Sequence, residues 1–159
     1  FRIDNKVNTP MTKWIGLPDD YSDIFGFVYI IKNNHPDVIK EKGKRYYIGC
    51  KQCLMRVKKK PLKGKTRNRI QFKDNGVNAY WGSSKELLAD IEKYGIENFS
   101  REVIELCDSK FHMKYAELNW QLMTNALLDP LYYNGIINIR LIGPKNFVDK
   151  PRSLDTLKL

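Results

Sequence analysis

Two short aromatic runs carry tyrosines whose hydroxyls could take part in chemistry. Residues 26–29 read Gly-Phe-Val-Tyr and residues 47–49 read Tyr-Ile-Gly, so the two candidates are Tyr29 and Tyr47. A tyrosine hydroxyl can donate or accept a hydrogen bond, although a tyrosine in a strand more often belongs to the core. Glu117 adds a carboxylate, which is a ligand that hard divalent cations prefer. These groups form a site only if the fold brings them together.

The cysteines do not predict a metal or redox centre. Cys50 and Cys53 form a C-x-x-C pair, but the second pair of ligands that a zinc site needs is missing. Cys107, His35 and His112 are scattered along the chain. We therefore expect no zinc, and reduced thiols in a cytoplasmic protein. No apolar run approaches the roughly 18 to 20 residues of a membrane span, so a membrane partner is not expected either.

Positive charge is concentrated in one segment of the chain. The net charge is +10, and residues 40–73 hold fourteen Lys and Arg against the single acid Glu41, so this segment carries +13 and the rest −3. A charge run can be a solvated loop, but phosphate binding also explains both the concentration of charge and its position beside the second tyrosine run. Pro61, Gly64 and Gly76 argue against a continuous helix and favour an extended excursion. The candidate nucleic-acid-binding residues are Lys58, Lys59, Lys60, Lys63, Lys65, Arg67 and Arg69.

The patterning around these residues predicts a small sheet. Residues 26–32 and 45–50 are short, aromatic and β-branched, which is typical of buried strands. The loop 33–43 would join them as an antiparallel pair and would leave His35 solvated. A third strand is expected at residues 100–107.

Two helices are expected beside this sheet. Ser83 or Ser84 is a candidate N-cap for a helix that stops at Gly95. Residues 108–109 would cap a longer helix that reaches about Asp129. Its polar stripe contains Glu117 and lies beside the apolar face. The residues expected on that apolar face are Phe111, Tyr115, Leu118, Leu122 and Ala126.

The two tyrosine runs together resemble the signature of the GIY-YIG nuclease family. The second run matches it letter for letter, whereas in the first run two residues instead of one separate Gly26 from Tyr29. Residues 116–120 (Ala-Glu-Leu-Asn-Trp) look like the family's metal-binding glutamate, followed one turn later by an aromatic residue. Residues 93–99 are similar to its helix-turn-strand segment, and Asn134 after a tyrosine looks like its late asparagine. The resemblance covers about residues 25–140 and is closest to the phage-borne, homing-type branch.

The resemblance implies a metal-dependent endonuclease that hydrolyses phosphodiester bonds in double-stranded DNA. Glu117 would hold Mg²⁺ or Mn²⁺, Tyr29 would be the general base, and Tyr47 would hydrogen-bond the phosphate or the attacking water. The pKa of a free tyrosine is near 10, so Lys51 or the metal would have to lower that of Tyr29. The enzyme would act in the cytoplasm of a bacterial host if it is encoded by a bacteriophage.

Two roles have more than one candidate. The family's phosphate-contacting arginine follows the second tyrosine run on a helix, and Arg56 lies at about the right distance. Arg67 and Arg69 are its rivals if the basic segment is an inserted hairpin that delays the helix. Asn134 fits the late asparagine, which is structural or contacts phosphate, and Asn138 is its competitor.

Each candidate residue also has a structural explanation. Glu117 could pair with Lys114 or hydrogen-bond Gln121 along its helix, and both tyrosines could be core residues. The rival function is then a non-catalytic basic module that binds DNA or RNA through residues 40–73. Only the nuclease predicts strand scission that stops when a chelator is added.

The expected fold is α+β, with a small three-stranded antiparallel sheet flanked by helices. Residues 1–24 would form an N-terminal arm anchored by Trp14, and residues 25–143 the nuclease domain, with a basic insertion at about 51–79. Residues 131–142 should pack back on the sheet, and residues 144–159 would form a C-terminal tail.

Overall fold

The centre of the protein is a three-stranded antiparallel sheet in the order β2-β1-β5. The computed structural model describes residues 13–159. The central strand β1 (Gly26–Asn33) is aromatic and β-branched, and only one of its eight residues is not fully buried, as a strand covered on both faces requires. It pairs with β2 (Tyr46–Gln52) and with β5 (Phe99–Cys107). The predicted α+β class and all three predicted strands are confirmed.

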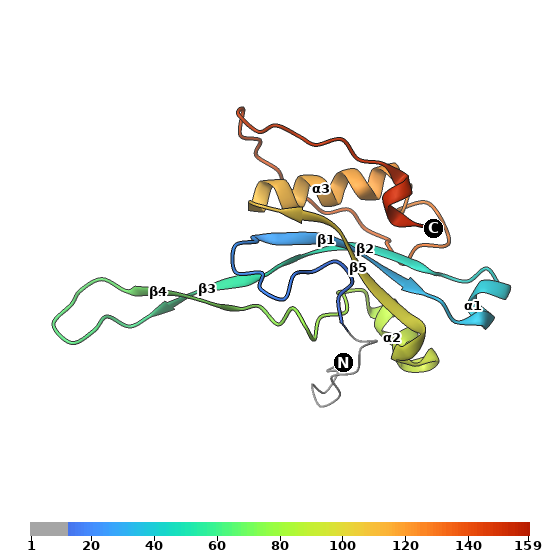
Figure 1. Cartoon of the computed structure of the whole chain (residues 1–159), viewed down its shortest axis with the longest axis horizontal. Coiled ribbons are helices and arrows are strands. Elements are labelled where there is room, and N and C mark those ends of the chain that lie inside the picture. The colour runs from blue at the N-terminus through green and yellow to red at the C-terminus, as the bar shows by residue number, and fades with distance from the viewer. Residues whose placement is uncertain (1–12) are drawn as a thin grey trace.

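One helix covers each face of this sheet (Figure 1). On one face, α2 (Lys85–Tyr94) packs over the side of β1 that carries Phe27 and Tyr29. On the other face, α3 (Lys110–Met123) packs over Val28. Two hydrophobic clusters result, because alternate side chains of β1 enter opposite layers.

The helix boundaries follow the predicted caps in part. Ser84 is the N-cap of α2, since its side chain accepts a hydrogen bond from the backbone N–H of Leu87, and the helix stops at Gly95, whose φ is +90°. Ser109 caps α3 in the same way. The structure differs from the expectation in that α3 ends at Met123, about one and a half turns before Asp129.

The buried face of α3 also differs from the expected one. Leu122 is 63% exposed, and Phe111, Tyr115 and Leu118 are only partly buried. The helix is therefore rotated about its axis relative to the expectation, and the face that it buries contains polar as well as apolar side chains. The residues that α3 buries are His112, Met113, Ala116, Trp120 and Gln121.

The basic segment forms an antiparallel hairpin, so the expected extended excursion without a continuous helix is confirmed. Strand β3 (Leu54–Lys59) pairs with β4 (Arg69–Asp74), and neither strand joins the central sheet. Figure 1 shows this hairpin projecting from the body as a long arm. We call residues 54–74 the arm; it is shorter than the predicted insertion at about 51–79 and confirms the hairpin alternative.

The loop between β1 and β2 contains a short helix that was not predicted, α1 (Pro36–Lys40). His35 caps it, because its Nδ1 accepts a hydrogen bond from the backbone N–H of Asp37 at 3.2 Å. The imidazole also lies 4.8 Å from the ring of Tyr94. The expectation that His35 is only solvated is therefore wrong.

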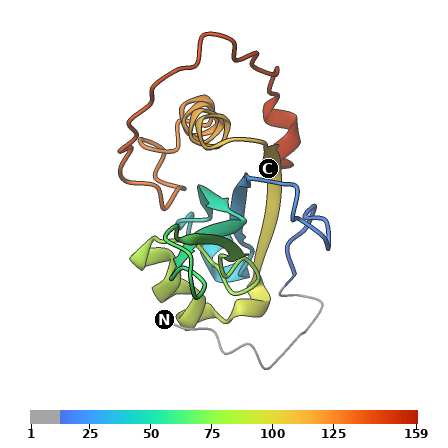
Figure 2. The ribbon, with the colours of Figure 1, turned by 90° about the vertical axis from the view of Figure 1, so that its left-hand side faces the viewer.

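Both ends of the described chain pack onto the body. Trp14 is buried against Phe27 and Tyr29, which confirms it as the anchor of the N-terminal segment. Residues 1–12 of that predicted segment (1–24) lie outside the described residues. The C-terminal segment arches around α3 (Figure 2) and ends in the short helix η3 (Leu154–Leu157), whose Leu157 is fully buried. Among residues 13–159, no helix is long and apolar enough to cross a membrane.

Candidate active site

A cavity of about 430 Å³ lies along the edge of β2 and collects three of the predicted site residues. Tyr47 comes from β2, Glu117 from α3, and Asn134 from the segment after α3. The rest of its wall comes from the start of α2, from α3 and from the segment after it. These lining residues are Ser83, Ser84, Lys114, Gln121, Tyr133, Gly135, Ile136, Ile137, Asn138 and Ile139.

Tyr47 presents its hydroxyl to this cavity. It is partly buried, and its hydroxyl shares a hydrogen bond of 3.2 Å with that of Ser83, which is exposed just before α2. Gly82 makes this approach possible, since a Cβ at that position would lie only 3.0 Å from the Tyr47 ring. The hydroxyl is thus positioned by the loop before α2 and can still meet a ligand.

Glu117 points its carboxylate into the same cavity from α3. Its side chain is 14% exposed, and Oε2 accepts a hydrogen bond from the thiol of Cys50 at 3.2 Å. Burial, together with the adjacent carboxylate, raises the pKa of Cys50 to about 12, so the thiol stays protonated and donates. Lys114 lies one turn earlier, with Nζ 3.7 Å from Oε2. The pairing with Lys114 that was weighed from the sequence is therefore present.

The side-chain amide of Asn134 pairs with the backbone of β2 at its free edge, as the backbone of a neighbouring strand would. Its Oδ1 accepts from the backbone N–H of Ile48 at 3.0 Å, and its Nδ2 donates to the carbonyl of the same residue at 2.8 Å. Gln121 donates to that carbonyl as well, at 3.3 Å. The structural alternative for the late asparagine is thus the one observed, and it fixes the β2 backbone beside Tyr47. Asn138, its competitor, lines the cavity.

Tyr29 is closed off from the cavity. Its residue exposure is 0%, and its hydroxyl is buried without a hydrogen bond of ordinary geometry to any described residue. Burial, with smaller effects from Tyr80 and Tyr47, raises its pKa well above the usual value. The hydroxyl lies so close to Gly49 that a Cβ there would sit 2.4 Å away. No described residue lowers this pKa, so the buried hydroxyl does not support Tyr29 as the general base, and that role stays a prediction.

Lys51 does not lower the pKa of Tyr29, because its ammonium lies over the ring of Tyr80, 4.3 Å from the centroid. None of the candidate arginines lines the cavity: Arg56 is on β3, Arg69 on β4 and Arg67 in the loop that joins them. The cation that does line the cavity is Lys114. Its sequence signal was its place one helical turn from Glu117.

A buried arginine that the sequence gave no reason to single out holds the loop before α2. Arg101 on β5 is 1% exposed and donates to the carbonyls of Asn78 and Tyr80 at 3.0 and 2.7 Å. Its guanidinium lies between the rings of Trp14 and Trp81, 4.6 and 4.2 Å from their centroids. Burial lowers its pKa to about 10. Arg101 therefore positions the loop that leads to Ser83.

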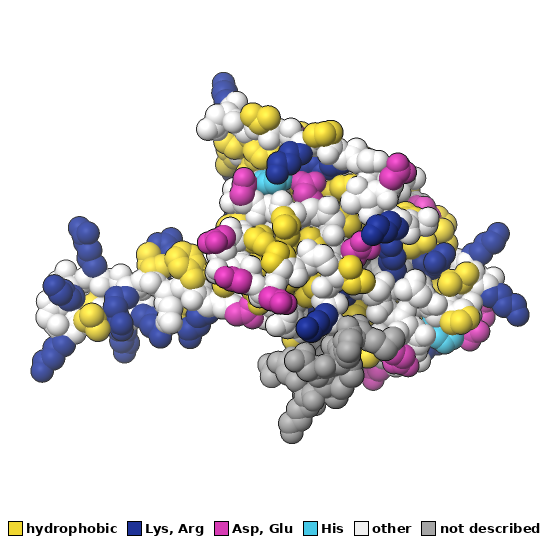
Figure 3. All heavy atoms as spheres, viewed as in Figure 1, with side chains coloured by type: hydrophobic (Ala, Val, Ile, Leu, Met, Phe, Trp, Pro, Cys, Tyr) yellow, Lys and Arg dark blue, Asp and Glu magenta, His cyan; other side chains and the backbone are white. Residues whose placement is uncertain are grey.

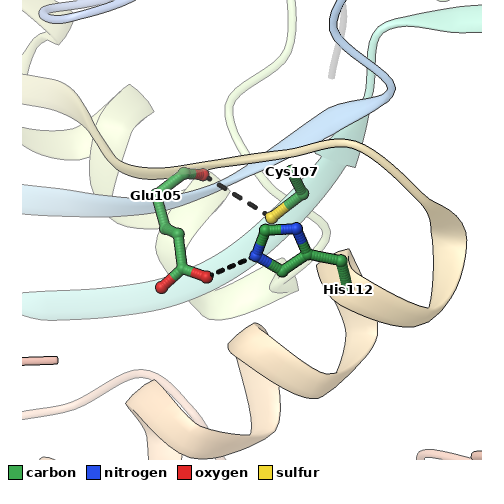
Figure 4. A group of neighbouring side chains, drawn as sticks. All are labelled: Glu105, Cys107 and His112. Carbon is green, nitrogen blue, oxygen red and sulfur yellow. Dashed lines mark hydrogen bonds and ion pairs between the residues drawn. The ribbon is translucent and has the colours of Figure 1, made fainter. Parts of the chain in front are cut away.

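A second polar cluster lies at the C-terminal end of β5 (Figure 4). Glu105, Cys107 and His112, which come from the end of β5 and the start of α3, place their donor atoms within 4.8 Å of one another. The Glu105 carboxylate is already saturated: it contacts His112 Nε2 at 2.8 Å, Trp120 Nε1 at 3.0 Å, and Arg152 Nε and Nη2 at 2.8 and 3.1 Å. The cluster serves as a hydrogen-bonded anchor for the C-terminal segment.

The donors around Glu117 fit a hard divalent cation. The cavity offers one carboxylate, serine hydroxyls and an asparagine amide, all oxygen ligands, and Mg²⁺ needs few of these because it retains waters and binds substrate phosphate. Contacts to Glu117 within residues 13–159 reach only Oε2, which leaves Oε1 for a metal. Lys114 is 39% exposed and long enough to turn away.

Comparison with known proteins agrees with this geometry. Residues 11–137 match the family model described as "Putative endonuclease segE, GIY-YIG domain", which spans the sheet, the arm, both flanking helices and the cavity. A curated relative, "Putative endonuclease segB" of Enterobacteria phage T4, is 44% identical over 66 residues. That segment covers 41% of this chain and only 29% of the phage protein. No solved structure matches.

The three-stranded sheet, with Tyr47 of β2 and Glu117 of α3 at one cavity, agrees with the GIY-YIG fold of the matched family. The chain belongs to the SegE-type GIY-YIG endonuclease family.

Proposed function

We propose that this protein is an endonuclease that hydrolyses phosphodiester bonds of double-stranded DNA with the help of Mg²⁺ or Mn²⁺. The observation that carries the proposal is the single cavity in which Tyr47, Glu117 and Lys114 meet. A second support is the arm, which follows the cavity strand β2 in the chain and holds nine of the Lys and Arg residues against one acid, Asp74. Homing is the biological role that we propose.

Each residue at the cavity has a distinct task. Glu117 binds the cation, which when present supplies positive charge to the scissile phosphate and to the leaving oxygen. Tyr47 orients the attacking water and takes part in its deprotonation, because its hydroxyl lies at the cavity beside that of Ser83, whereas the hydroxyl of Tyr133 is engaged by Asp90 and Asn33. Lys114 can contact a phosphate oxygen once a cation replaces it at Glu117. Asn134 holds the β2 backbone and so fixes where Tyr47 points.

The arm supplies affinity for the substrate. Lysines bind phosphate as point charges and release counterions, so a string of them gives sequence-independent attraction to DNA. Lys58, Lys59 and Lys60 form such a string at the outer end of β3, and Arg67 and Arg69 continue it. Arg56 lies on β3 nearer the body and is the arm arginine closest in sequence to the cavity strand β2.

Supercoiled plasmid provides the test. The wild-type protein should nick or linearise it with Mg²⁺ and leave it intact with EDTA. Glu117→Gln should abolish cleavage but retain DNA binding, because it removes the metal ligand and leaves the arm unchanged. Glu92→Gln, an exposed position on α2, is the matched control and should cut at the wild-type rate.

The rival function is a non-catalytic module that binds nucleic acid through the arm. It predicts binding without scission under every metal condition. Cleavage by Glu117→Gln at the wild-type rate would remove the proposed mechanism, and intact plasmid with wild-type protein and Mg²⁺ or Mn²⁺ would favour the rival.

A further inference from the structure

The arm has two faces of different composition, because alternate side chains of a strand point to opposite sides and paired residues share a side. On the first face, Arg56 pairs with Phe72, and Leu54 and Lys58 lie on the same side of β3. Leu54 and Phe72 also line a groove with residues 22–25 of the body. The root of this first face is therefore turned toward the domain.

The second face is the one that turns away from that groove. Along β4 it carries Arg69, Gln71 and Lys73 in alternate positions, and all three are exposed. Lys59 lies opposite Arg69 on β3. Arg69 donates from Nε to the Lys60 carbonyl at 3.3 Å, a single bond from a guanidinium that has five donors. On β3 this face also carries Met55 and Val57, opposite Lys73 and Gln71, so it combines two apolar side chains with side-chain types that recognise base edges.

The shape of the arm suits one kind of nucleic-acid surface. It is an isolated two-stranded ribbon, and its six-residue strands extend about 20 Å at 3.3 Å per residue. The major groove of B-form DNA, about 12 Å wide, admits a two-stranded β-ribbon. The major groove of A-form RNA is too narrow and deep for side chains to read. Figure 3 shows dark blue cationic side chains along the whole length of the arm, which complements the phosphates on both sides of such a groove.

We propose that the arm enters the major groove of duplex DNA with the face of Arg69, Gln71 and Lys73 toward the base edges, and that this face selects the sequence. The proposal rests on the proposed function for its choice of substrate. Arginine pairs bidentately with guanine O6 and N7, and glutamine with adenine N6 and N7. Gln71 carries no charge, so it adds less to phosphate attraction than the cations on either side of it, and its exposed amide suits an adenine contact.

Selection from duplex DNA with a randomised centre tests the inference without any cleavage step. Full-length wild-type protein would be used in EDTA, so that binding is measured alone. We expect an enriched motif that contains guanine and adenine. Gln71→Ala should reduce discrimination against a changed adenine by roughly 5- to 150-fold, the worth of one bidentate pair, while affinity for unrelated duplex stays within about twofold.

Arg56→Ala on the opposite face is the matched control. It should weaken binding to the selected and unrelated duplexes by the same factor, because it removes a phosphate contact and no base contact. Both variants are at exposed positions of the arm, so circular dichroism should show an intact fold. The inference is overturned if wild-type protein enriches no motif, if Gln71→Ala keeps full discrimination, or if duplex RNA of the same sequence binds as tightly as DNA.

Failure of this inference can be told from failure of the nuclease proposal. If the protein enriches a motif in EDTA but never cuts DNA, the proposed role of the arm stands and the nuclease proposal is wrong. If the protein cuts plasmid with Mg²⁺ but enriches no motif, the nuclease proposal stands. The proposed sequence selection by Arg69, Gln71 and Lys73 is then wrong.

Discussion

Tyr47 and Tyr29 lie on adjacent strands with rings 6.2 Å apart, yet only one of them meets the cavity. Tyr47→Phe should reduce the cleavage rate by roughly 10² to 10⁴, the usual worth of a positioned proton-transfer group. Tyr29→Phe should keep the rate within about tenfold, because the hydroxyl it removes is buried away from substrate. Single-turnover cleavage of a short duplex with saturating protein measures both, and binding in EDTA checks that affinity is unchanged.

The two phenylalanine variants also differ in stability. Tyr29→Phe removes a buried hydroxyl with no well-formed hydrogen bond, so the free energy of unfolding should stay the same or rise slightly. If Tyr29→Phe loses activity while Tyr47→Phe keeps it, proton transfer must be reassigned to Tyr29 in a more open form of the site.

The types and spacing of the residues predicted which side chains lie at the candidate site, but not which of them are exposed there. Glu117 was expected beside the apolar face of its helix, and the polar stripe that carries it does reach the cavity. Tyr29 and Tyr47 are indistinguishable by type and strand setting. What separates them is packing from distant parts of the chain, Trp14 and Tyr80 against Tyr29, which strand periodicity does not contain.

The arm is the element whose charge can be removed without touching the core. Replacing Lys58, Lys59 and Lys60 together by glutamine should weaken binding to every duplex sequence, since lysines carry little base information. If all three contact phosphate, the slope of log affinity against log salt becomes shallower by up to about 3. Fluorescence anisotropy across a salt series in EDTA gives that slope.

A matched triple variant keeps the change in net charge the same. Lys110, Lys145 and Lys150 are exposed and lie outside the arm, so their replacement by glutamine should leave the slope nearly unchanged. Equal slopes for the two triple variants would mean that total charge, and not the arm, attracts DNA.

Element boundaries were predictable where a local signal exists. Ser84 and Gly95 mark the ends of α2 through caps that involve neighbouring residues only. The rotation of α3 was not predictable in this way, because it depends on His112 and Gln121, polar residues that are buried since Glu105 and the Ile48 carbonyl accept their hydrogen bonds. Those partners lie on strands β5 and β2, and the spacing of apolar residues along α3 contains no information about them.

At the scale of the whole molecule, Arg152 fastens the C-terminal segment to the sheet. Its guanidinium is 5% exposed and binds the Glu105 carboxylate and Asp149. Arg152→Ala leaves Glu105 with its remaining donors but no cation, and should lower the free energy of unfolding by about 3 kcal/mol. Urea denaturation measures this, with exposed Arg140→Ala as control. A loss below about 1 kcal/mol would show that the pair contributes little.

Alkaline pH should destabilise the fold as a whole. Burial raises the thiol pKa of Cys50 and Cys107 to about 12, and that of Cys53 to about 11, from an ordinary value of 9.0. The unfolded chain therefore loses these protons first, so stability is complete below about pH 9 and falls as the pH rises toward 12. Lys32, Lys51 and Arg101, whose pKa burial lowers, act in the opposite sense, but Tyr29, Tyr132 and Tyr133, whose pKa burial raises, add to the effect of the thiols. Urea midpoints at pH 8 and pH 10 should show the decline, and constant midpoints would contradict it.

The central position of β1 has a consequence for the newly made chain. Its partners are β2, which follows closely, and β5, which is not complete until residue 107 has been synthesised. A chain emerging from the ribosome can form the β1–β2 pair early, but one edge of β1, with its apolar side chains, stays open while residues 34–98 are added. The arm is made during that interval, and its dense positive charge repels a second nascent chain just when the open edge is most prone to aggregate. The lysines that we propose bind DNA in the finished protein would then also reduce aggregation of the unfinished one.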